Sequence, residues 1–161
     1  MPLETISACR LCGWRELKEV LSLGDMAFTG IFPKPGETVP HGPLDLWECQ
    51  ACGLVQLHHI YDQNVLYGPH YGYRSGLNSS MVRHLKDVAA IAWKEAMPSP
   101  GDMVIDIGAN DGTLLSAYPD TVTRIGIDPL ADKYAEFWPK GITRIATSFP
   151  DHALHSYYFT P

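Results

Sequence analysis

The sequence predicts an α/β chain in two parts, a β-rich N-terminal module followed by the first part of a parallel α/β domain. Three observations lead to this fold class. The four cysteines form two C-x-x-C pairs, both within residues 9–52. The stretch "MVIDIGANDGTLL", residues 103–115, passes from apolar residues through a turn of glycine and acid back to apolar residues. From there on, strand-like and helix-like patterns alternate, which predicts parallel strands joined by right-handed crossovers.

The composition is that of a globular protein, with 45% hydrophobic and 19% charged residues in 161. The formal net charge is −6, and the 12 lysines and arginines are scattered along the chain. A protein that binds phosphate backbones needs clustered basic residues, so we expect no nucleic-acid partner. We find neither a bilayer-length apolar stretch nor a signal-peptide pattern, and we therefore expect a cytoplasmic protein with no membrane association.

The N-terminal module is expected to span residues 1–78. Residues 17–26 form a short amphipathic stretch, and residues 32–43 contain four prolines and must be loop. Residues 44–57 then read as a strand, a cysteine turn and a second strand.

The α/β part is expected to span residues 79–161. Apolar residues at helical spacing predict a linking helix over residues 80–96, stopped by Pro98 and Pro100. Three strands and two intervening helices follow, in the order 102–108, 112–118, 123–128, 131–138 and 142–147. The tail, residues 148–161, shows no clear period.

The cysteine pairs predict a structural zinc site. Zn²⁺ takes four ligands in a tetrahedron, and a two-residue gap lets two thiolates reach one metal. Gly13 and Gly53 directly follow the second cysteine of each pair, where the chain must turn sharply and glycine accepts a positive φ. The gap over residues 13–48 exceeds usual zinc-ribbon spacing, and the proline-rich loop accounts for the excess. A redox motif and a pair of disulfides remain alternatives that suit the doubled spacing and the expected compartment less well. The predicted ligands are Cys9, Cys12, Cys49 and Cys52.

The turn after residue 107 has the position of a cofactor site in α/β proteins but not the dinucleotide pattern. That fingerprint, G-x-G-x-x-G, would need glycine at 110 and 113, where the sequence has Asn110 and Thr113. Asp106 and Asp111 flank the turn and would repel a pyrophosphate. A strand-to-helix turn capped by Asn or Asp, with no cofactor, is the plain alternative.

Several motifs together resemble the sugar C-methyltransferases of deoxysugar pathways. They are the two CxxCG turns, "LGDMAFTGIFPKP", "YGYRSGLNSSMVRHL", "IDIGANDGTLL" and "GIDP", and the similarity runs from about residue 9 to about residue 145. The family places an N-terminal zinc module before a Rossmann-like class I methyltransferase domain that binds S-adenosylmethionine. The D-x-G-x-x-x-G spacing of this chain resembles motif I of such domains.

The resemblance implies roles for individual residues. Asp106 would lie near the methionyl ammonium of the cofactor, and Asp128 would bind both ribose hydroxyls. An acid at position 128 is also expected for NAD, so it does not choose between cofactors. Tyr73, in a segment that includes Tyr71 and Ser75, would lie over the substrate pocket, although an aromatic residue that packs a small module is an equal alternative. The expected cofactor-binding residues are Asp106, Gly108, Asn110, Asp111, Gly112 and Asp128.

The resemblance also implies that the chain is incomplete. The family's catalytic Glu-His pair lies well downstream of motif I, and a class I sheet has seven strands where this chain supplies about three. We therefore expect the N-terminal portion of a C-methyltransferase that acts on a nucleotide-linked keto-sugar, incomplete or inactive as this chain, with the catalytic residues unassigned. The histidines at 58, 59, 70 and 84 are interpreted as surface or packing residues. A zinc-ribbon module that recruits a protein partner beside a remnant α/β domain is the alternative from another class, and an NAD(P)-dependent protein is a third.

Overall fold

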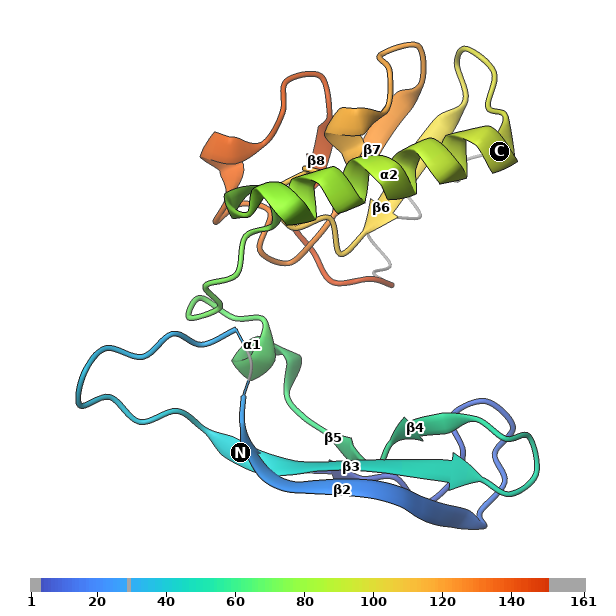
Figure 1. The fold of residues 1–161 in the computed structure, drawn as a ribbon, viewed down its shortest axis with the longest axis vertical. Coiled ribbons are helices and arrows are strands. Elements are labelled where there is room, and N and C mark those ends of the chain that lie inside the picture. Colours follow the sequence, from blue (N-terminus) through green and yellow to red (C-terminus); the bar gives the residue numbers. More distant parts are fainter. Residues whose placement is uncertain (1–3, 29, 151–161) are drawn as a thin grey trace. The chain divides into compact units, whose positions relative to one another are not determined.

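The computed structural model describes residues 4–28 and 30–150, and the chain divides into two compact units, Met1–Gly72 and Tyr73–Pro161. Figure 1 shows β-strands alone dominating the first unit, and a long helix with a small sheet in the second. The α/β class is confirmed. The contacts group residues 73–78 with the second unit, whereas the sequence analysis placed the boundary after residue 78. Most of the tail, residues 151–161, lies outside the described residues.

The first unit is built on an antiparallel sheet in the order β2-β3-β4. Its strands are β2 (Leu17–Ala27), β3 (His41–Cys49) and β4 (Val55–Leu57). The amphipathic stretch at 17–26 is therefore a strand, and the strand, turn and strand expected over 44–57 are confirmed. β1 (Glu4–Thr5) pairs with β5 (His59–Ile60), and the short helix α1 (Gln63–Leu66) follows. The long connection between β2 and β3 contains three of the four prolines of residues 32–43.

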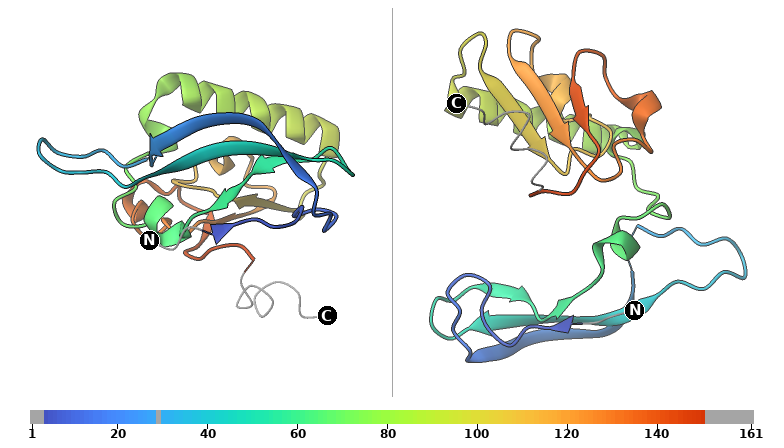
Figure 2. Two further views of the ribbon diagram at one scale, coloured as in Figure 1. Left: turned by 90° about the horizontal axis from the view of Figure 1, so that it is seen from below. Right: turned by 180° about the vertical axis from the view of Figure 1, so that it is seen from behind.

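The second unit carries a parallel sheet in the order β6-β7-β8, as the alternating pattern predicts. The strands are β6 (Met103–Ile107), β7 (Thr123–Ile127) and β8 (Thr143–Ile145). Figure 1 and the right-hand view of Figure 2, which are seen from opposite sides, show α2 (Ser79–Ala96) running across one face of this sheet. Asn78 caps the helix through a hydrogen bond from the Ser80 N–H, and Met97 ends it in the left-handed conformation just before Pro98.

The core of the second unit lies between α2 and the sheet. Ala89 of the helix is buried together with Leu115 and Tyr118, and Trp93 and Val104 pack against this cluster. Val104 alternates along β6 with apolar residues of the opposite face, which are 43–55% exposed: Met103, Ile105 and Ile107. Parallel strands are usually covered on both faces. In the described residues, this face of β6 is left largely open.

The prediction of helices over residues 112–118 and 131–138 is wrong. The structure has only the 3₁₀ turns η2 (Leu115–Ala117) and η3 (Ala135–Phe137) there, and a third, η1 (Ser75–Leu77), before α2. Both predicted helices end at a residue that precedes proline, Tyr118 and Trp138, and both of these residues are extended with ψ of 145° and 125°. A proline disfavours helical backbone in the residue before it. Too few residues remain upstream of either position to complete a stable helix.

Candidate functional site

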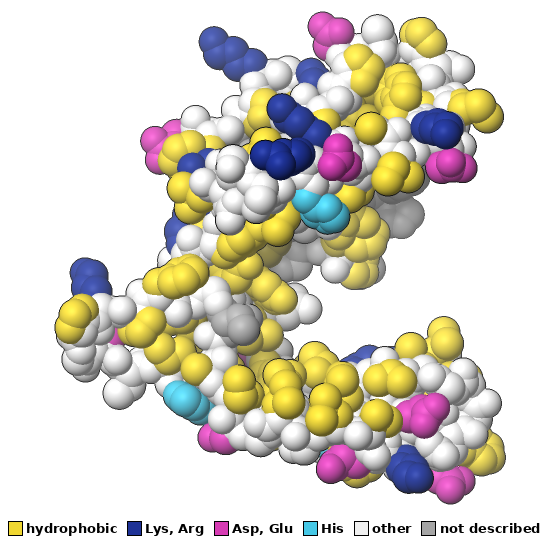
Figure 3. Space-filling model, viewed as in Figure 1, with side chains coloured by type: hydrophobic (Ala, Val, Ile, Leu, Met, Phe, Trp, Pro, Cys, Tyr) yellow, Lys and Arg dark blue, Asp and Glu magenta, His cyan; other side chains and the backbone are white. Residues whose placement is uncertain are grey.

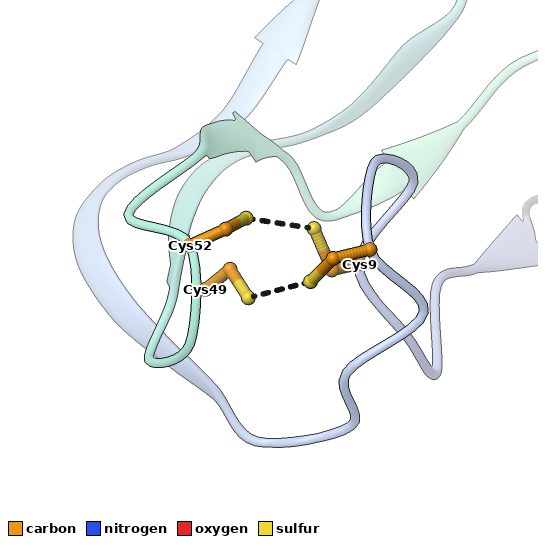
Figure 4. Close-up of side chains that lie close together, drawn as sticks. Cys9, Cys49 and Cys52 are labelled. Atoms are coloured by element: carbon orange, nitrogen blue, oxygen red, sulfur yellow. Dashed lines mark hydrogen bonds between the residues drawn. The ribbon is translucent and has the colours of Figure 1, made fainter.

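The four cysteines converge in the first unit. Cys9 and Cys12 lie before β2, Cys49 ends β3, and Cys52 follows in the next turn. Their Sγ atoms all lie within 4.8 Å of one another, with 3.7 Å between Cys9 and Cys52 and 3.6 Å between Cys12 and Cys49 (Figure 4). Zn–S bonds of about 2.3 Å in a regular tetrahedron place the sulfurs about 3.8 Å apart. None of the four forms a disulfide. The spacing of the sulfurs therefore fits one tetrahedral Zn²⁺.

The two cysteine turns share one backbone geometry. The N–H of Gly13 donates to the Cys9 carbonyl and the N–H of Gly53 donates to the Cys49 carbonyl, each at 2.9 Å. Their φ angles are 75° and 72°, which is the left-handed region that glycine enters without strain. The prediction that a glycine follows each cysteine pair because the turn needs a positive φ is thus confirmed. The two turns share this geometry because each holds two cysteines of the same site.

The ionisation of the thiols also fits a cation. The backbone N–H of Cys12 lowers the pKa of the Cys9 thiol to about 6, which outweighs the effect of burial. The N–H of Leu54 favours the thiolate of Cys52, but burial and the hydrogen bonds with the other sulfurs raise its pKa to about 12. Four thiolates cannot share this volume without a positive charge, and a bound metal deprotonates its thiol ligands. Four thiolates would leave no coordination position open, so a zinc ion bound by all four would be structural rather than catalytic.

In the second unit, the turn Gly108–Gly112 follows β6. Its N-terminal end is fixed by the N–H groups of Gly108 and Ala109, which donate to the Ile127 carbonyl at 2.8 and 3.2 Å. Gly108, Asn110 and Gly112 all have positive φ, at 81°, 53° and 76°. Asn110 therefore takes the left-handed conformation that makes asparagine a substitute for glycine. A Cβ atom on Gly112 would meet Pro139 at 2.9 Å, so this glycine is also needed for packing.

Asp128 ties this turn to the end of β7. Its carboxylate accepts the N–H of Asn110 at 2.9 Å and the N–H of Leu130 at 2.6 Å, and the residue is 7% exposed. The carboxyl ends of β6 and β7 thus meet at one edge of the sheet, which is where open α/β sheets bind ligands.

Asp106, on β6, is partly buried, and its pKa is raised by burial first and by the negative charge of Asp128 second. Two acids and a left-handed turn therefore lie together. Such a site favours a cationic ligand over a phosphate, because a phosphate would be repelled by both carboxylates.

The segment Tyr73–Leu77, here called the strap, lies against the turn. The carbonyl of Tyr73 accepts hydrogen bonds from Asn110 Nδ2 and the Tyr134 hydroxyl, at 3.2 and 2.9 Å, and Arg74 forms an ion pair with Asp111 at 3.1 Å. Tyr73 is 36% exposed. The sequence analysis assigned Tyr73 to the site and missed Arg74 and Tyr134. Only two signals in the sequence could have identified Arg74. It directly follows Tyr73, and the turn carries two acids that a basic residue could pair with.

His58 and His59 lie side by side in the first unit, with ring centroids 5.0 Å apart. His58 stacks on Trp47 with ring centroids 3.9 Å apart, and burial lowers its pKa, with a smaller effect from His59. This confirms a packing role for His58. The sequence analysis missed the proximity of His59 to Asp45, whose carboxylate lies 3.6 Å from the imidazole Nδ1. Both groups belong to the first unit.

Within residues 4–28 and 30–150, no helix combines the length and the apolar character needed to cross a bilayer.

Comparison with known proteins places both parts in a methyltransferase context. Residues 9–67 match the family Methyltransf_13, described as "Putative zinc binding domain". The chain is also 28% identical over 150 residues to the C-methyltransferase NovU of Streptomyces niveus, and this match covers 89% of the chain. The chain spans about a third (35%) of the length of that relative. The four-cysteine cluster lies within the matched range. The chain is therefore a relative of a C-methyltransferase and carries a methyltransferase-type zinc-binding domain at its N-terminus.

Proposed function

We propose that the chain is the N-terminal portion of an S-adenosylmethionine-dependent C-methyltransferase that acts on a nucleotide-linked keto-deoxysugar. The observation that carries the proposal is the edge of the parallel sheet where Asp106, Asp128 and the left-handed Asn110 meet. Similarity to a C-methyltransferase over most of the chain supports it.

The residues of this edge fit a cofactor that bears an ammonium and a sulfonium and no phosphate. Asp106 would hold the ammonium, whose charge would offset the raised pKa of its carboxyl. Asp128 retains acceptor capacity beyond its two backbone donors, and would use it for the ribose hydroxyls. When bound, the cofactor supplies an electrophilic methyl group. In this proposal Asp106 and Asp128 bind and orient the cofactor, and Tyr73 lies on the substrate side.

Zinc serves a separate purpose in this proposal. The cysteine cluster belongs to the first unit and offers no open coordination position, so zinc stabilises that unit and takes no part in methyl transfer. The proposal leaves the general base unassigned. The open face of β6 supports its description of the chain as a portion of a longer protein, because parallel strands are usually covered on both faces.

The partners proposed are small molecules in a cytoplasmic setting, with no nucleic acid and no membrane. The net charge of −6 supports the absence of a nucleic-acid partner. On the face drawn in Figure 3, lysine and arginine side chains are interspersed with acidic and apolar ones.

The protein-interaction module remains the second candidate because apolar residues of β2 lie at the surface. Val20, Leu21 and Leu23 are 46–55% exposed, and Figure 3 shows apolar side chains on the surface of this unit. Exposed apolar clusters mark interaction sites in many proteins. A protein of this kind needs no ligand at Asp106 and Asp128, so ligand binding separates the two candidates.

Replacing Asp106 by asparagine is the test of the proposed cofactor. Calorimetric titration should show saturable binding of S-adenosylhomocysteine by the zinc-loaded wild type, no binding of NADH, and at least about tenfold weaker binding by Asp106→Asn, because the ammonium loses a charged partner. Binding of NADH alone, or no binding of either ligand by the folded protein, would reject the proposal.

The stability of this variant provides the control. The pKa of Asp106 is raised above 3.8 in the folded state. Ionisation of this carboxyl therefore lowers the free energy of unfolding, and the loss grows as the pH rises from below 3.8 through the folded-state pKa. Asp106→Asn removes that cost. The variant should be at least as stable as the wild type at pH 7 in thermal unfolding, and its loss of affinity then cannot come from unfolding.

A further inference from the structure

Three of the four polar side-chain atoms of Asn110 and Asp111 bind the strap. Asn110 Oδ1 accepts the Ser75 N–H at 2.9 Å while its Nδ2 donates to the Tyr73 carbonyl at 3.2 Å. Asp111 Oδ2 accepts the Gly76 N–H at 2.8 Å and Arg74 Nη1 at 3.1 Å. These bonds join two stretches of chain that are 35–37 residues apart in sequence.

The carboxylate of Asp111 has no acceptor position left for a ligand. Its other oxygen accepts the N–H and the hydroxyl of Thr113, at 3.2 and 2.5 Å. An ionised carboxylate offers about four acceptor positions, and these two bonds with those from the strap fill them. Asp111 is 2% exposed and Asn110 is 8% exposed. Both side chains are therefore buried, and the carboxylate of Asp111 has no free position for a cofactor atom.

The strap is also closely fitted at Gly76. A Cβ atom at this position would lie 2.7 Å from Asp111 Oδ2 and 3.0 Å from Arg74 Nη1. The guanidinium of Arg74 lies 3.7 Å from the ring centroid of Phe137, and this cation–π contact also holds the arginine side chain in place. Only glycine lets the strap backbone approach the carboxylate this closely.

We propose that Asn110 and Asp111 are positioning residues: they hold the strap on the turn before any ligand binds, and in this way fix Tyr73 at the edge of the site. Their side chains then serve the strap, and a ligand at the turn would contact only the backbone of these two residues. The ligand part of this inference rests on the proposed function, whereas the hydrogen bonds between turn and strap do not.

Amide hydrogen exchange in the ligand-free protein tests the strap directly. The Ser75 and Gly76 amides are expected to exchange at least about tenfold more slowly than unprotected amides, because each donates to a buried side-chain oxygen. In Gly76→Ala this protection should be lost, since the new methyl group cannot lie beside Asp111. Asp111→Asn should lose it in part, because the ion pair with Arg74 is removed.

Two controls make the result specific. Leu77→Ala changes a strap residue that is 69% exposed and should leave both amides protected. The Ala109 amide, which donates to Ile127, should stay protected in every variant and reports that the turn is intact. Unprotected Ser75 and Gly76 amides in the wild type, or equal protection in Gly76→Ala, would overturn the inference.

Ligand affinity separates a positioning role from a merely structural one. S-adenosylhomocysteine should bind Gly76→Ala about tenfold or more weakly than it binds Leu77→Ala, with Ala109 still protected in both. Equal affinities, together with a released strap in Gly76→Ala, would overturn the positioning role. If the wild type binds no S-adenosylhomocysteine, the proposed function fails, and the exchange of Ser75 and Gly76 alone decides whether the turn holds the strap.

Discussion

Removal of zinc is expected to unfold the first unit, Met1–Gly72, while the sheet of the second unit persists. The apolar core of the first unit is small, because its buried hydrophobic residues in the described part of the chain are Ile6, Cys9, Phe28 and Cys49. Two of these four are predicted zinc ligands. Small domains of this kind need a metal or disulfides to offset chain entropy, and structural zinc contributes about 10–16 kcal/mol of apparent binding free energy at pH 7. No other change considered for this chain has so large an expected effect.

Cys49→Ser should reproduce the effect of a chelator, because Cys49 is 1% exposed and ends β3. The measurements are metal content, expected at one zinc per wild-type chain and strongly reduced in the variant, and the amide spectrum of each unit. Arg10→Ala is the control: it lies in the other turn of the same cluster, between Cys9 and Cys12, and removes only the side-chain bond to the Leu57 carbonyl, at 2.6 Å. A first unit that keeps its spectrum after complete zinc removal would contradict a structural role.

Asp128→Ala is expected to weaken cofactor binding strongly and to destabilise the second unit. The variant leaves the buried N–H groups of Asn110 and Leu130 without their acceptor, which should cost about 3 kcal/mol or more in the free energy of unfolding. Loss of the bonds proposed for two ribose hydroxyls should weaken S-adenosylhomocysteine binding by about 100-fold or more, at about 1.4 kcal/mol for each factor of ten.

Two further variants show which part of that loss belongs to the ligand. Asp128→Asn keeps one carbonyl oxygen for the backbone, and should recover part of the stability but little of the affinity. Asp120→Ala removes an exposed acid that makes no described contact with the turn, and it should change neither the stability nor the affinity. Chemical denaturation measures the free energy of unfolding, and calorimetry measures the affinity for S-adenosylhomocysteine. Full affinity in a folded Asp128→Asn would reject the ribose role.

The features that the sequence predicted are those that depend on local chemistry. Two cysteines two residues apart can reach one metal whatever the rest of the chain does, and the positive φ of Gly13 and Gly53 follows from the turn that this requires. The three parallel strands were predicted from the apolar run in β6 and from the strand-like patterns that follow it. The linking helix was predicted to within one residue at each end, since the spacing of its apolar residues and the prolines that follow it agree.

The features that the sequence did not predict depend on contacts between distant residues or on competition between local rules. The apolar spacing in residues 112–118 and 131–138 suggested helices, but Pro119 and Pro139 force the residue before each into extended backbone. The contact of Arg74 with Asp111 joins residues 37 positions apart, and no periodicity signals it. The role expected for the Asp111 side chain as a cofactor contact stays a prediction, and its hydrogen bonds favour a role in holding the strap.

Mapping of S-adenosylhomocysteine on the amide spectrum of the zinc-loaded chain tests the central claim most directly, because it locates the ligand as well as detecting it. The account predicts saturable shifts at the amides of Gly108, Asn110, Gly112 and Leu130, where β6 and β7 end, and none around the four cysteines. A spectrum that does not change, or shifts confined to the first unit, would contradict the claim that this edge of the sheet is a cofactor site.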